Sequence, residues 1–537
     1  MNDAEFSQSG PALENTWEHD PFLQSGLRRL LPEDTFAEIL PGLASLGERA
    51  AFEMPIYAAD AERNPPEHFP YDPWGRRVDE IRVAEGWRQL HRVAAEEGVV
   101  ATAYERHEGE YSRLHQFARL YLYHPSSAIC SCPLAMTDGA ARVVELHGTD
   151  AMRARALPRL TSRDPEKFWT SGQWMTERAG GSDVSRTETV ARQNGEIFRL
   201  HGAKWFTSAT TSQMAFTLAR IETERDASSQ LSLFYLELRD HDGRLNGIRI
   251  NRLKDKLGTR ALPTAELTLE GTPATLVGES GKGVRTISTL LNITRLYNAC
   301  SAASQMRRAV TLARDYAHKR KAFGKPLIEH ALHERTLAEM ETETRGATLM
   351  VLHAAALLGR DETNVASETE RKLLRLLTPV IKLYTAKQCV AVCSEALESF
   401  GGAGYVEDTG LPALLRDAQV LSIWEGTTNV LSLDLLRAAG KDDSIPLWLD
   451  DVNARLRQLR ECELSSAISV IQTRIHAFME KLQGGDPESN ARRLAYAMAR
   501  IHGAVLLAEQ AAWETGQATV QTRLSLDSWL SREIVTA

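Results

Sequence analysis

The stretch 421-LSIWEGTTNVLSLD-434 is the one around which the other motifs of the chain can be arranged. At its centre a single acid, Glu425, stands between a tryptophan and a flexible glycine. The residues that follow have the apolar spacing of a helix, which Thr427 or Thr428 could cap and Gly440 could end. A carboxylate at such a junction is well positioned but still mobile, and the adjacent indole would exclude water and raise its affinity for a proton. These properties suit a general base; the alternative is an acid of the first helical turn that interacts with the helix dipole.

The same stretch resembles the catalytic segment of the acyl-CoA dehydrogenase family, in which Tyr-Glu-Gly-Thr or Trp-Glu-Gly-Thr is followed by a short polar residue. The resemblance implies that Glu425 removes the pro-R α proton of an acyl-CoA thioester while the β hydrogen leaves as hydride to flavin N5. It also implies that the flavin ribityl chain and the Glu425 main chain polarise the thioester carbonyl through hydrogen bonds. Trp424, Thr427 and Asn429 are then expected to contact the cofactor.

Composition indicates a globular protein with several packed units. The chain has 537 residues, 43% of them hydrophobic, and a net charge of −8 that gives no support to nucleic-acid binding by the protein as a whole. Its six cysteines lack the spacing of zinc ligands, so we expect no metal site and reduced, mostly buried thiols. The polar N-terminus and the lack of a run of about 18 apolar residues predict a cytoplasmic protein without a membrane span.

The N-terminal third is predicted to be helical. Residues 1 to about 20 have the character of an arm that reaches a neighbouring subunit, and from Pro21 to Val144 apolar residues recur at helical spacing, with an interruption at Pro41. The segment 64-NPPEHFPYDPWGRRVDEI-81 is rich in proline and is expected to form an extended, rigid loop with a solvated charged rim. This segment resembles the AidB-like, alkylation-response branch of the family, to which we assign the chain.

Near Trp169 the pattern changes to short apolar strands. They follow one another with no helix between them, which indicates an antiparallel barrel or sandwich rather than a Rossmann unit, and no G-x-G-x-x-G follows a strand. The predicted strands are Trp169–Met175, Thr187–Ala191, Ile197–Leu200, Met214–Ala219, Leu231–Leu238, Ile248–Leu253 and Ala265–Leu269.

Two segments of this region resemble flavin-binding signatures of the family. The first, 173-QWMTERAGGSDV-184, is similar to T-E-P-x-x-G-S-D, and its glycines and hydroxyls suit contacts with flavin or phosphate oxygens. The second, 202-GAKWFTS-208, is similar to G-x-K-x-W-I-T-N, with Phe206 where a tryptophan commonly covers the flavin ring. An ordinary turn and a core aromatic residue are the alternatives. The resemblance assigns cofactor contacts to Gln173, Trp174, Met175, Thr176, Ser182, Phe206, Thr207 and Ser208.

The C-terminal half has the pattern of long antiparallel helices. On the first of them, Arg295 resembles an arginine near the entrance for the CoA phosphates. The segment 320-RKAFGKPL-327 resembles R-x-x-F-G-x-x-L, in which the arginine bonds the flavin pyrophosphate of a neighbouring subunit and the phenylalanine packs on the cofactor. The segment 401-GGAGY-405 resembles a loop laid against the adenosine part of FAD from the other subunit. Arg320, Phe323, Gly401 and Gly402 are therefore assigned to the cofactor, and a dimer or a dimer of dimers is implied.

A tail from about Ile445 to Ala537 has the spacing of three or four amphipathic helices. Alkylation-response relatives bind DNA with such a tail. Here the tail contains about ten basic and about eleven acidic residues, a balance that favours a packing or tetramer-forming domain over DNA binding. We expected its arginines to lie on solvated helix faces, notably Arg455, Arg457, Arg460, Arg492, Arg493 and Arg500.

The resemblance thus implies a mostly α protein with a central β-barrel domain, that is, an acyl-CoA dehydrogenase-like fold with an extra C-terminal helical domain. The expected domains are an arm and helical domain over 1–168, a barrel over 169–277, a four-helix bundle over 278–440 and the additional helical domain over 445–537. The implied function is FAD-dependent α,β-dehydrogenation of an acyl-CoA held by Ser182, Arg295 and Glu425, with chain length and electron acceptor unspecified. The alternative is an AidB-like flavoprotein that binds DNA and retains vestigial dehydrogenation.

Overall fold

A computed structural model describes residues 8–222, 227–441, 443–459, 462–484, 486–515 and 521–532. The chain divides into two compact units, each built from separate segments. The barrel unit comprises Glu53–Glu105 and Ser126–Tyr297, and the helical unit comprises Met1–Phe52, Arg106–Pro125 and Asn298–Ala537. None of the described helices combines the length and the apolar content that a membrane crossing requires.

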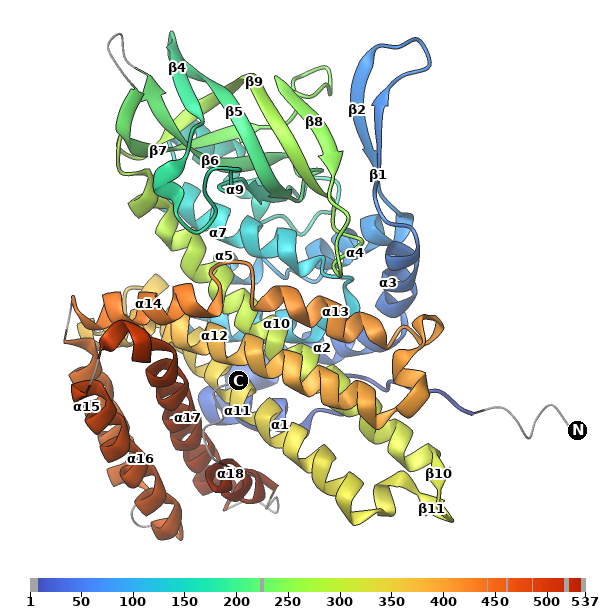
Figure 1. The fold of residues 1–537 in the computed structure, drawn as a ribbon, viewed down its shortest axis with the longest axis vertical. Coiled ribbons are helices and arrows are strands. Elements are labelled where there is room, and N and C mark those ends of the chain that lie inside the picture. Colours follow the sequence, from blue (N-terminus) through green and yellow to red (C-terminus); the bar gives the residue numbers. More distant parts are fainter. Residues whose placement is uncertain are drawn as a thin grey trace, which may run out of the picture. The chain divides into compact units, whose positions relative to one another are not determined.

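The centre of the barrel unit is a seven-stranded sheet that closes on itself (Figure 1). The strands follow the order β3-β6-β4-β5-β9-β7, β8 pairs with β9, and β7 pairs again with β6. This last pairing makes a closed barrel, so of the two predicted alternatives the barrel is confirmed and the sandwich is wrong. Most pairs are antiparallel, whereas β3 and β4 pair with β6 in parallel. The strands are β3 Ser171–Gln173, β4 Val190–Asn194, β5 Ile197–Ser208, β6 Met214–Glu222, β7 Ala227–Glu237, β8 Ile248–Leu253 and β9 Thr264–Val277.

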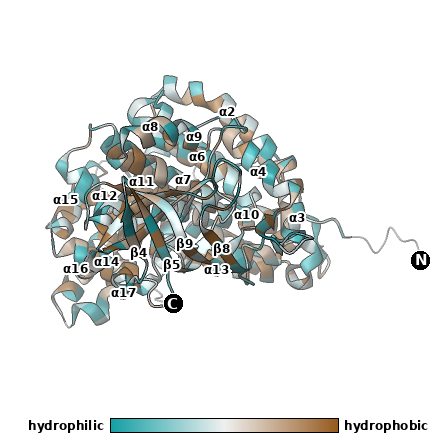
Figure 2. Cartoon of the chain, turned by 90° about the horizontal axis from the view of Figure 1, so that it is seen from above, coloured by the Kyte–Doolittle hydropathy of each residue, from teal (hydrophilic) through white to brown (hydrophobic). Residues whose placement is uncertain are grey.

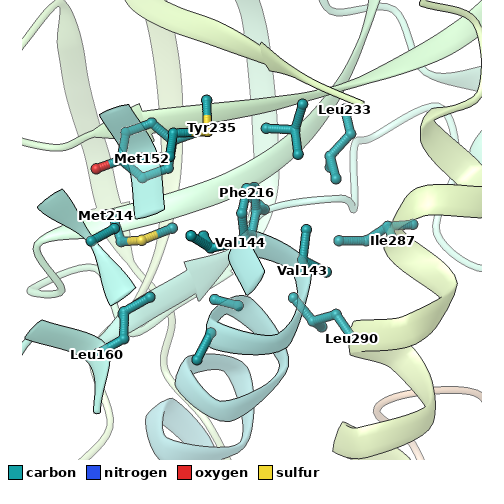
Figure 3. Packing of buried hydrophobic residues seen from close by; sticks show 14 of the residues in the cluster. Val143, Val144, Met152, Leu160, Met214, Phe216, Leu233, Tyr235, Ile287 and Leu290 are labelled. Carbon is teal, nitrogen blue, oxygen red and sulfur yellow. The ribbon is translucent and has the colours of Figure 1, made fainter. Parts of the chain in front are cut away.

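Helices of the barrel unit cover part of the barrel with apolar side chains. Val143 and Val144 on one helix, Phe216 on β6, and Ile287 and Leu290 on another helix meet in one buried cluster (Figure 3). These two helices approach closely because a glycine of α7 faces Leu290, where an added Cβ would lie 2.5 Å from its Cγ. The helices of this unit are α3 Met54–Arg63, α4 Glu85–Glu96, α5 Thr102–Glu105, α7 Ser131–His147, α8 Asp150–Arg155, α9 Leu157–Leu160 and the first part of α10 Gly283–Lys319.

The proline-rich segment is a hairpin rather than an irregular loop. Strands β1 Glu67–Tyr71 and β2 Arg77–Arg82 pair antiparallel. Asp79 is buried, and its carboxylate binds the His68 imidazole at 2.8 Å and the Arg77 guanidinium at 2.8 Å and accepts from the backbone of Ile250 at 3.2 Å. The expected solvated rim is therefore wrong at Asp79, because this acid attaches the hairpin to β8.

The helical unit consists of long amphipathic helices, whose ribbons alternate between hydrophobic and hydrophilic residues (Figure 2). Pro41 lies inside α2 and does not interrupt it, because a proline removes only one backbone hydrogen bond and Ile39, Leu43 and Leu46 stay packed on the core. The helices are α1 Pro21–Leu30, α2 Glu33–Phe52, α6 Ser112–Tyr123, the second part of α10, α11 Ala331–Glu362, α12 Glu368–Ser399, α13 Pro412–Leu421, α14 Thr428–Ala439, α15 Ser444–Gln458, α16 Ser465–Gln483, α17 Pro487–Glu514 and α18 Gln521–Ser531.

The end of the segment expected to be an arm is attached to the core. Its first seven residues lie outside the described residues. Trp17 is 2% exposed, and the backbone N–H of Thr16 donates to Gly47 on α2 at 3.1 Å. Asn15 packs so closely on Gly47 that any side chain there would collide with it. Asn15, Trp17 and Asp20 are therefore buried in the core of their own chain, whereas Glu18 and His19 are exposed.

The C-terminal helices α15–α18 pack on the bundle (Figure 1). Buried charges as well as apolar residues lie on these helices. Arg500 is buried, donates to Glu343 on α11 at 2.7 Å, and lies 3.8 Å above the Trp529 ring. Arg455 is half-buried and pairs with Asp451 at 2.8 Å. The expectation of solvated faces is wrong for both arginines, because each meets an acid from within the helical unit; Arg460 lies outside the described residues.

Candidate active site

The predicted catalytic acid lies in the loop between α13 and α14. Glu425 has a φ of +55° and Gly426 a φ of +106°, so two successive residues adopt left-handed backbone conformations. A non-glycine residue in this region is strained, and such strain is concentrated at functional sites. Thr427 occupies the N-cap position of α14, but its side chain makes no capping hydrogen bond, so the expected hydroxyl cap is not formed.

Two polar side chains from neighbouring helices hold this loop. The Lys382 ammonium on α12 donates to the carbonyls of Trp424 and Gly426, at 2.7 Å each. The Trp424 indole N–H donates to the Asn298 carboxamide on α10, whose Nδ2 donates in turn to the carbonyl of Leu421 at 3.0 Å. The loop is therefore anchored on both sides of Glu425, and the indole beside the acid has a fixed orientation.

In the barrel unit, a buried ion pair fixes the turn that follows β3. The Lys204 ammonium donates to Glu177 at 2.6 Å, and Thr189 donates to the same carboxylate at 2.5 Å. Burial favours the neutral acid, but the Lys204 charge and these hydrogen bonds outweigh it and hold the pKa of Glu177 below its usual value. The backbone N–H of Trp205 also donates to the carbonyl of Thr176 in this turn, at 2.9 Å. The predicted flavin turn is thus rigid.

Several polar groups of this turn have no partner in the described part of the chain. The Gln173 side-chain oxygen is buried and accepts no hydrogen bond there. The hydroxyls of Thr176 and Ser182 are likewise bonded to no described residue. A buried acceptor without a partner is rare in folded proteins, so this one indicates a ligand or water that supplies a donor. These groups fit a polar cofactor such as a flavin.

Other residues assigned to the cofactor use their side chains within the protein. Trp174 is fully buried and donates to the carbonyl of Ser208 at 3.3 Å, and the Thr207 hydroxyl donates to Ala265 at 2.7 Å. The hydroxyls of Ser208 and Thr264 lie 3.1 Å apart. Buried Met175 also packs in the apolar cluster. The side chains of Trp174 and Thr207 are therefore engaged within the protein.

The aromatic pair on β5 has a cation above it that the sequence interpretation missed. Phe206 is 51% exposed, and the Lys254 ammonium lies 4.6 Å from its ring centroid and 3.5 Å from that of Trp205. Lys254 also pairs with Glu266 at 2.6 Å. Lys254 is therefore not a solvated surface charge, because aromatic rings and an acid enclose its ammonium.

The remaining assigned residues lie at or near the surface. Phe323 lies between β10 Lys321–Ala322 and β11 Lys325–Pro326 and is 98% exposed, and Arg320 precedes this hairpin on the surface. A Cβ added at Gly401 or Gly402 would meet no atom within 4 Å. Asn429 is exposed with no side-chain partner in the described residues, and Arg295 is half-buried on α10.

Comparison with known proteins establishes the family. Residues 172–272 match the middle domain and residues 281–440 the C-terminal domain of acyl-CoA dehydrogenases. Acyl-CoA dehydrogenase family member 11 of Caenorhabditis elegans is 45% identical over 540 residues, which cover 94% of this chain and 86% of that protein. The chain belongs to the acyl-CoA dehydrogenase family. Members of the family are oxidoreductases and flavoproteins.

The flanking segments confirm the predicted branch of the acyl-CoA dehydrogenase family. Residues 9–167 match the N-terminal domain of the adaptive response protein AidB, and residues 445–536 match a domain like the C-terminal one of acyl-CoA dehydrogenase 11. The putative acyl-CoA dehydrogenase AidB of Escherichia coli is 33% identical over 413 residues, 75% of this chain and 74% of that protein. The crystal structure of C. elegans ACDH-11 in complex with C11-CoA superimposes with a TM-score of 0.96 at 42% identity, covering 99% and 93% of the two chains. The predicted fold class is thereby confirmed.

Proposed function

We propose that this acyl-CoA dehydrogenase is FAD-dependent, oxidises the α,β bond of an acyl-CoA, and uses Glu425 as its general base. The observation that carries the proposal is the loop geometry: an acid at φ +55°, followed by a glycine at φ +106°, with both flanking carbonyls held by one ammonium. A merely structural first-turn acid would not require a strained backbone or such anchoring. A general base benefits from such anchoring, because its carboxylate must meet one particular proton.

In the barrel unit, the residues assigned to FAD offer the groups that a flavin requires. The Gln173 side-chain oxygen and the Thr176 and Ser182 hydroxyls would make hydrogen bonds, since they have no partner in the described residues. Phe206 would supply an apolar surface for a planar ring. In the helical unit, Arg320 and Phe323, with Gly401 and Gly402, would meet FAD held by another chain, in a dimer of dimers. When bound, FAD supplies the acceptor for the β hydride.

The chain itself supplies the proton acceptor and its surroundings. Glu425 takes the α proton, and its main-chain N–H donates to the thioester carbonyl, which stabilises the negative charge that develops there. The fixed indole of Trp424 excludes water from one side of the carboxylate. Ser182 and Arg295 would contact the acyl-CoA. The C11-CoA bound to ACDH-11 supports an acyl-CoA as the substrate here.

The buried charges favour a packing role for the C-terminal domain over DNA binding. DNA affinity needs lysines and arginines whose charges are available to phosphates. Arg500 and Arg455 are instead neutralised by acids within the helical unit. We therefore propose that α15–α18 act as a structural domain of the enzyme.

Anaerobic titration tests the proposed activity. The purified protein should contain FAD, and acyl-CoAs from butyryl-CoA to palmitoyl-CoA, with C11-CoA among them, should bleach the oxidised flavin band. If none of them bleaches the flavin, and DNA binds with an affinity that falls steeply with salt, the DNA-binding alternative is correct instead.

A further inference from the structure

Lys382 is a charged residue in the most apolar part of a long helix. It lies on α12 between Ile381 and Leu383, and its exposed fraction is 0%. Burying an ammonium is unfavourable unless strong acceptors surround it. Among its acceptors are the carbonyls of Trp424 and Gly426, both at 2.7 Å, which is the short distance typical of hydrogen bonds from a charged donor.

The two carbonyls belong to the residues on either side of Glu425. One ammonium can reach both only because the backbone turns at Glu425 and Gly426, the two positions with positive φ. The contact therefore selects the strained conformation that presents the acid. The Trp424–Asn298 and Leu421–Asn298 hydrogen bonds hold the loop on its other side.

The same ammonium places a positive charge beside the base. Nζ contacts the carbonyls on both sides of Glu425, and a glutamate side chain extends only about 5 Å from its Cα, so the carboxylate lies within roughly 10 Å of Nζ. A cation at such a distance favours the ionised acid and opposes the effect of the apolar indole. The helices α12, α13 and α14 also carry Arg375, which pairs with Asp434, and Arg416, which pairs with Glu407 of the short helix Glu407–Thr409. Asp417 and Arg437 are two further charged residues of these helices.

We propose that Lys382 is a positioning residue for the general base: it holds the Glu425 loop through two carbonyls and keeps the carboxylate ionised at neutral pH. This role rests on the proposed function of Glu425. No motif of the sequence marks Lys382, which lies 42 residues from Trp424 in the chain.

The test compares Lys382→Met, which removes the charge, with Lys382→Arg, which keeps it, and with Lys382→Gln, which keeps a donor without charge. Lys372→Met is the matched control, because Lys372 is on the same helix and pairs with Glu368 at the surface. Hydrogen exchange of peptides covering residues 421–431 reports on the loop without any substrate. The pH dependence of flavin bleaching by an acyl-CoA reports on the base.

We expect the Lys382→Met variant to keep its FAD. The amides of its loop should exchange at least roughly 10-fold faster, and the acyl-CoA should bleach its flavin roughly 100-fold more slowly. The pH midpoint of bleaching should rise by about one unit in the Met and Gln variants and return toward the parental value in Lys382→Arg. Lys372→Met should match the parent in every measurement.

The outcomes separate the two proposals. Parental exchange in the Met and Gln variants overturns the holding role, and a parental pH midpoint in both overturns the electrostatic role. If the parental protein is bleached by no acyl-CoA, the proposed function fails, while hydrogen exchange still decides whether Lys382 holds the loop. If Lys382→Met does not fold, the comparison of the Gln and Arg variants tests the holding role and the electrostatic role in the same way.

Discussion

The imidazole rings of His353 and His502 are joined nitrogen to nitrogen, Nδ1 to Nε2, at 3.0 Å inside the helical unit. Arg455 fixes the direction of this contact, because a guanidinium only donates and its Nη2 lies 3.0 Å from His353 Nε2. A neutral His353 therefore carries its proton on Nδ1 and donates to His502. His502 then carries its own proton on Nδ1, which has no partner in the described residues.

This chain of donors predicts that the protein loses stability in mild acid. Burial, and then the Arg455 charge, lower the pKa of His502 to about 3 and that of His353 well below its usual value. The unfolded chain takes up these protons below about pH 6.5, while the folded protein does not, so stability falls as the pH falls. We expect the free energy of unfolding in urea to drop by about 1.4 kcal/mol per histidine between pH 7.5 and 5.5.

The variant His502→Gln tests the assignment. A glutamine can still accept a hydrogen bond from His353 through its amide oxygen, but it does not titrate. The decrease in the free energy of unfolding between pH 7.5 and 5.5 should therefore be smaller by the contribution of one histidine. Carboxylates of ordinary or lowered pKa titrate mainly below this range and leave the comparison clear. An unchanged pH dependence in His502→Gln would contradict the buried neutral pair.

Glu425→Gln should keep FAD and lose flavin bleaching. The amide fits the same space but cannot accept the α proton, so the bleaching rate should fall by roughly 1,000-fold, within the usual contribution of a general base. Stopped-flow absorbance under anaerobic conditions measures the rate. Glu395→Gln, an exposed acid on α12, is the control and should bleach normally. Full bleaching by Glu425→Gln would place the base elsewhere.

Local sequence patterns predicted the elements of the fold but not the contacts that join them. Short apolar runs marked the strands, and the segment around Glu425 was predicted as a loop leading into a helix, which is where the structure places it. Barrel closure by β7 on β6 is a tertiary pairing, which alternation of apolar residues does not specify. The predicted helix interruption at Pro41 is wrong, because the packing of the whole helix outweighs one missing hydrogen bond.

Long-range partners also explain why charged side chains were misread. Helical spacing places Arg500 on a face but does not show that Glu343, 157 positions earlier, covers that face. The sequence signal for Lys382 was weak, since it is a lone charge within an apolar helical run. Its two acceptors lie 42 and 44 positions away in the sequence. A lone cation between apolar neighbours is thus worth testing as a buried contact before it is assigned to solvent.

Arg500→Met should destabilise the helical unit strongly. Among the described residues, the substitution leaves the buried Glu343 with two weaker partners, Arg532 at 3.4 Å and the Tyr384 hydroxyl at 2.8 Å. Removing one member of a buried ion pair costs about 3–5 kcal/mol, which urea denaturation can measure. The double variant Arg500→Met with Glu343→Leu should recover part of this loss, because it no longer buries an unbalanced acid.

Arg335→Met provides the matched control for that measurement. Arg335 pairs with Glu339 on the surface of α11, where both side chains are largely exposed. An exposed pair contributes about 0–1 kcal/mol, so this variant should resemble the parent. Equal losses in Arg335→Met and Arg500→Met would show that Arg500 does not join α17 to α11 as described.

Gly402→Val should weaken FAD binding without weakening the fold. A Cβ at Gly402 meets no atom within 4 Å, so the glycine is not required by packing within the chain; it is explained if a ligand approaches the backbone there. We expect the FAD dissociation constant, measured by flavin fluorescence, to rise at least roughly 10-fold, with the apoprotein melting as the parent does. Gly404→Val is the contrasting control, because a Cβ there would collide with the carbonyl of Leu397 and lower the melting temperature of the apoprotein itself. If Gly402→Val binds FAD as tightly as the parent, the 401–405 loop does not approach the cofactor, and the assignment of Gly401 and Gly402 is wrong.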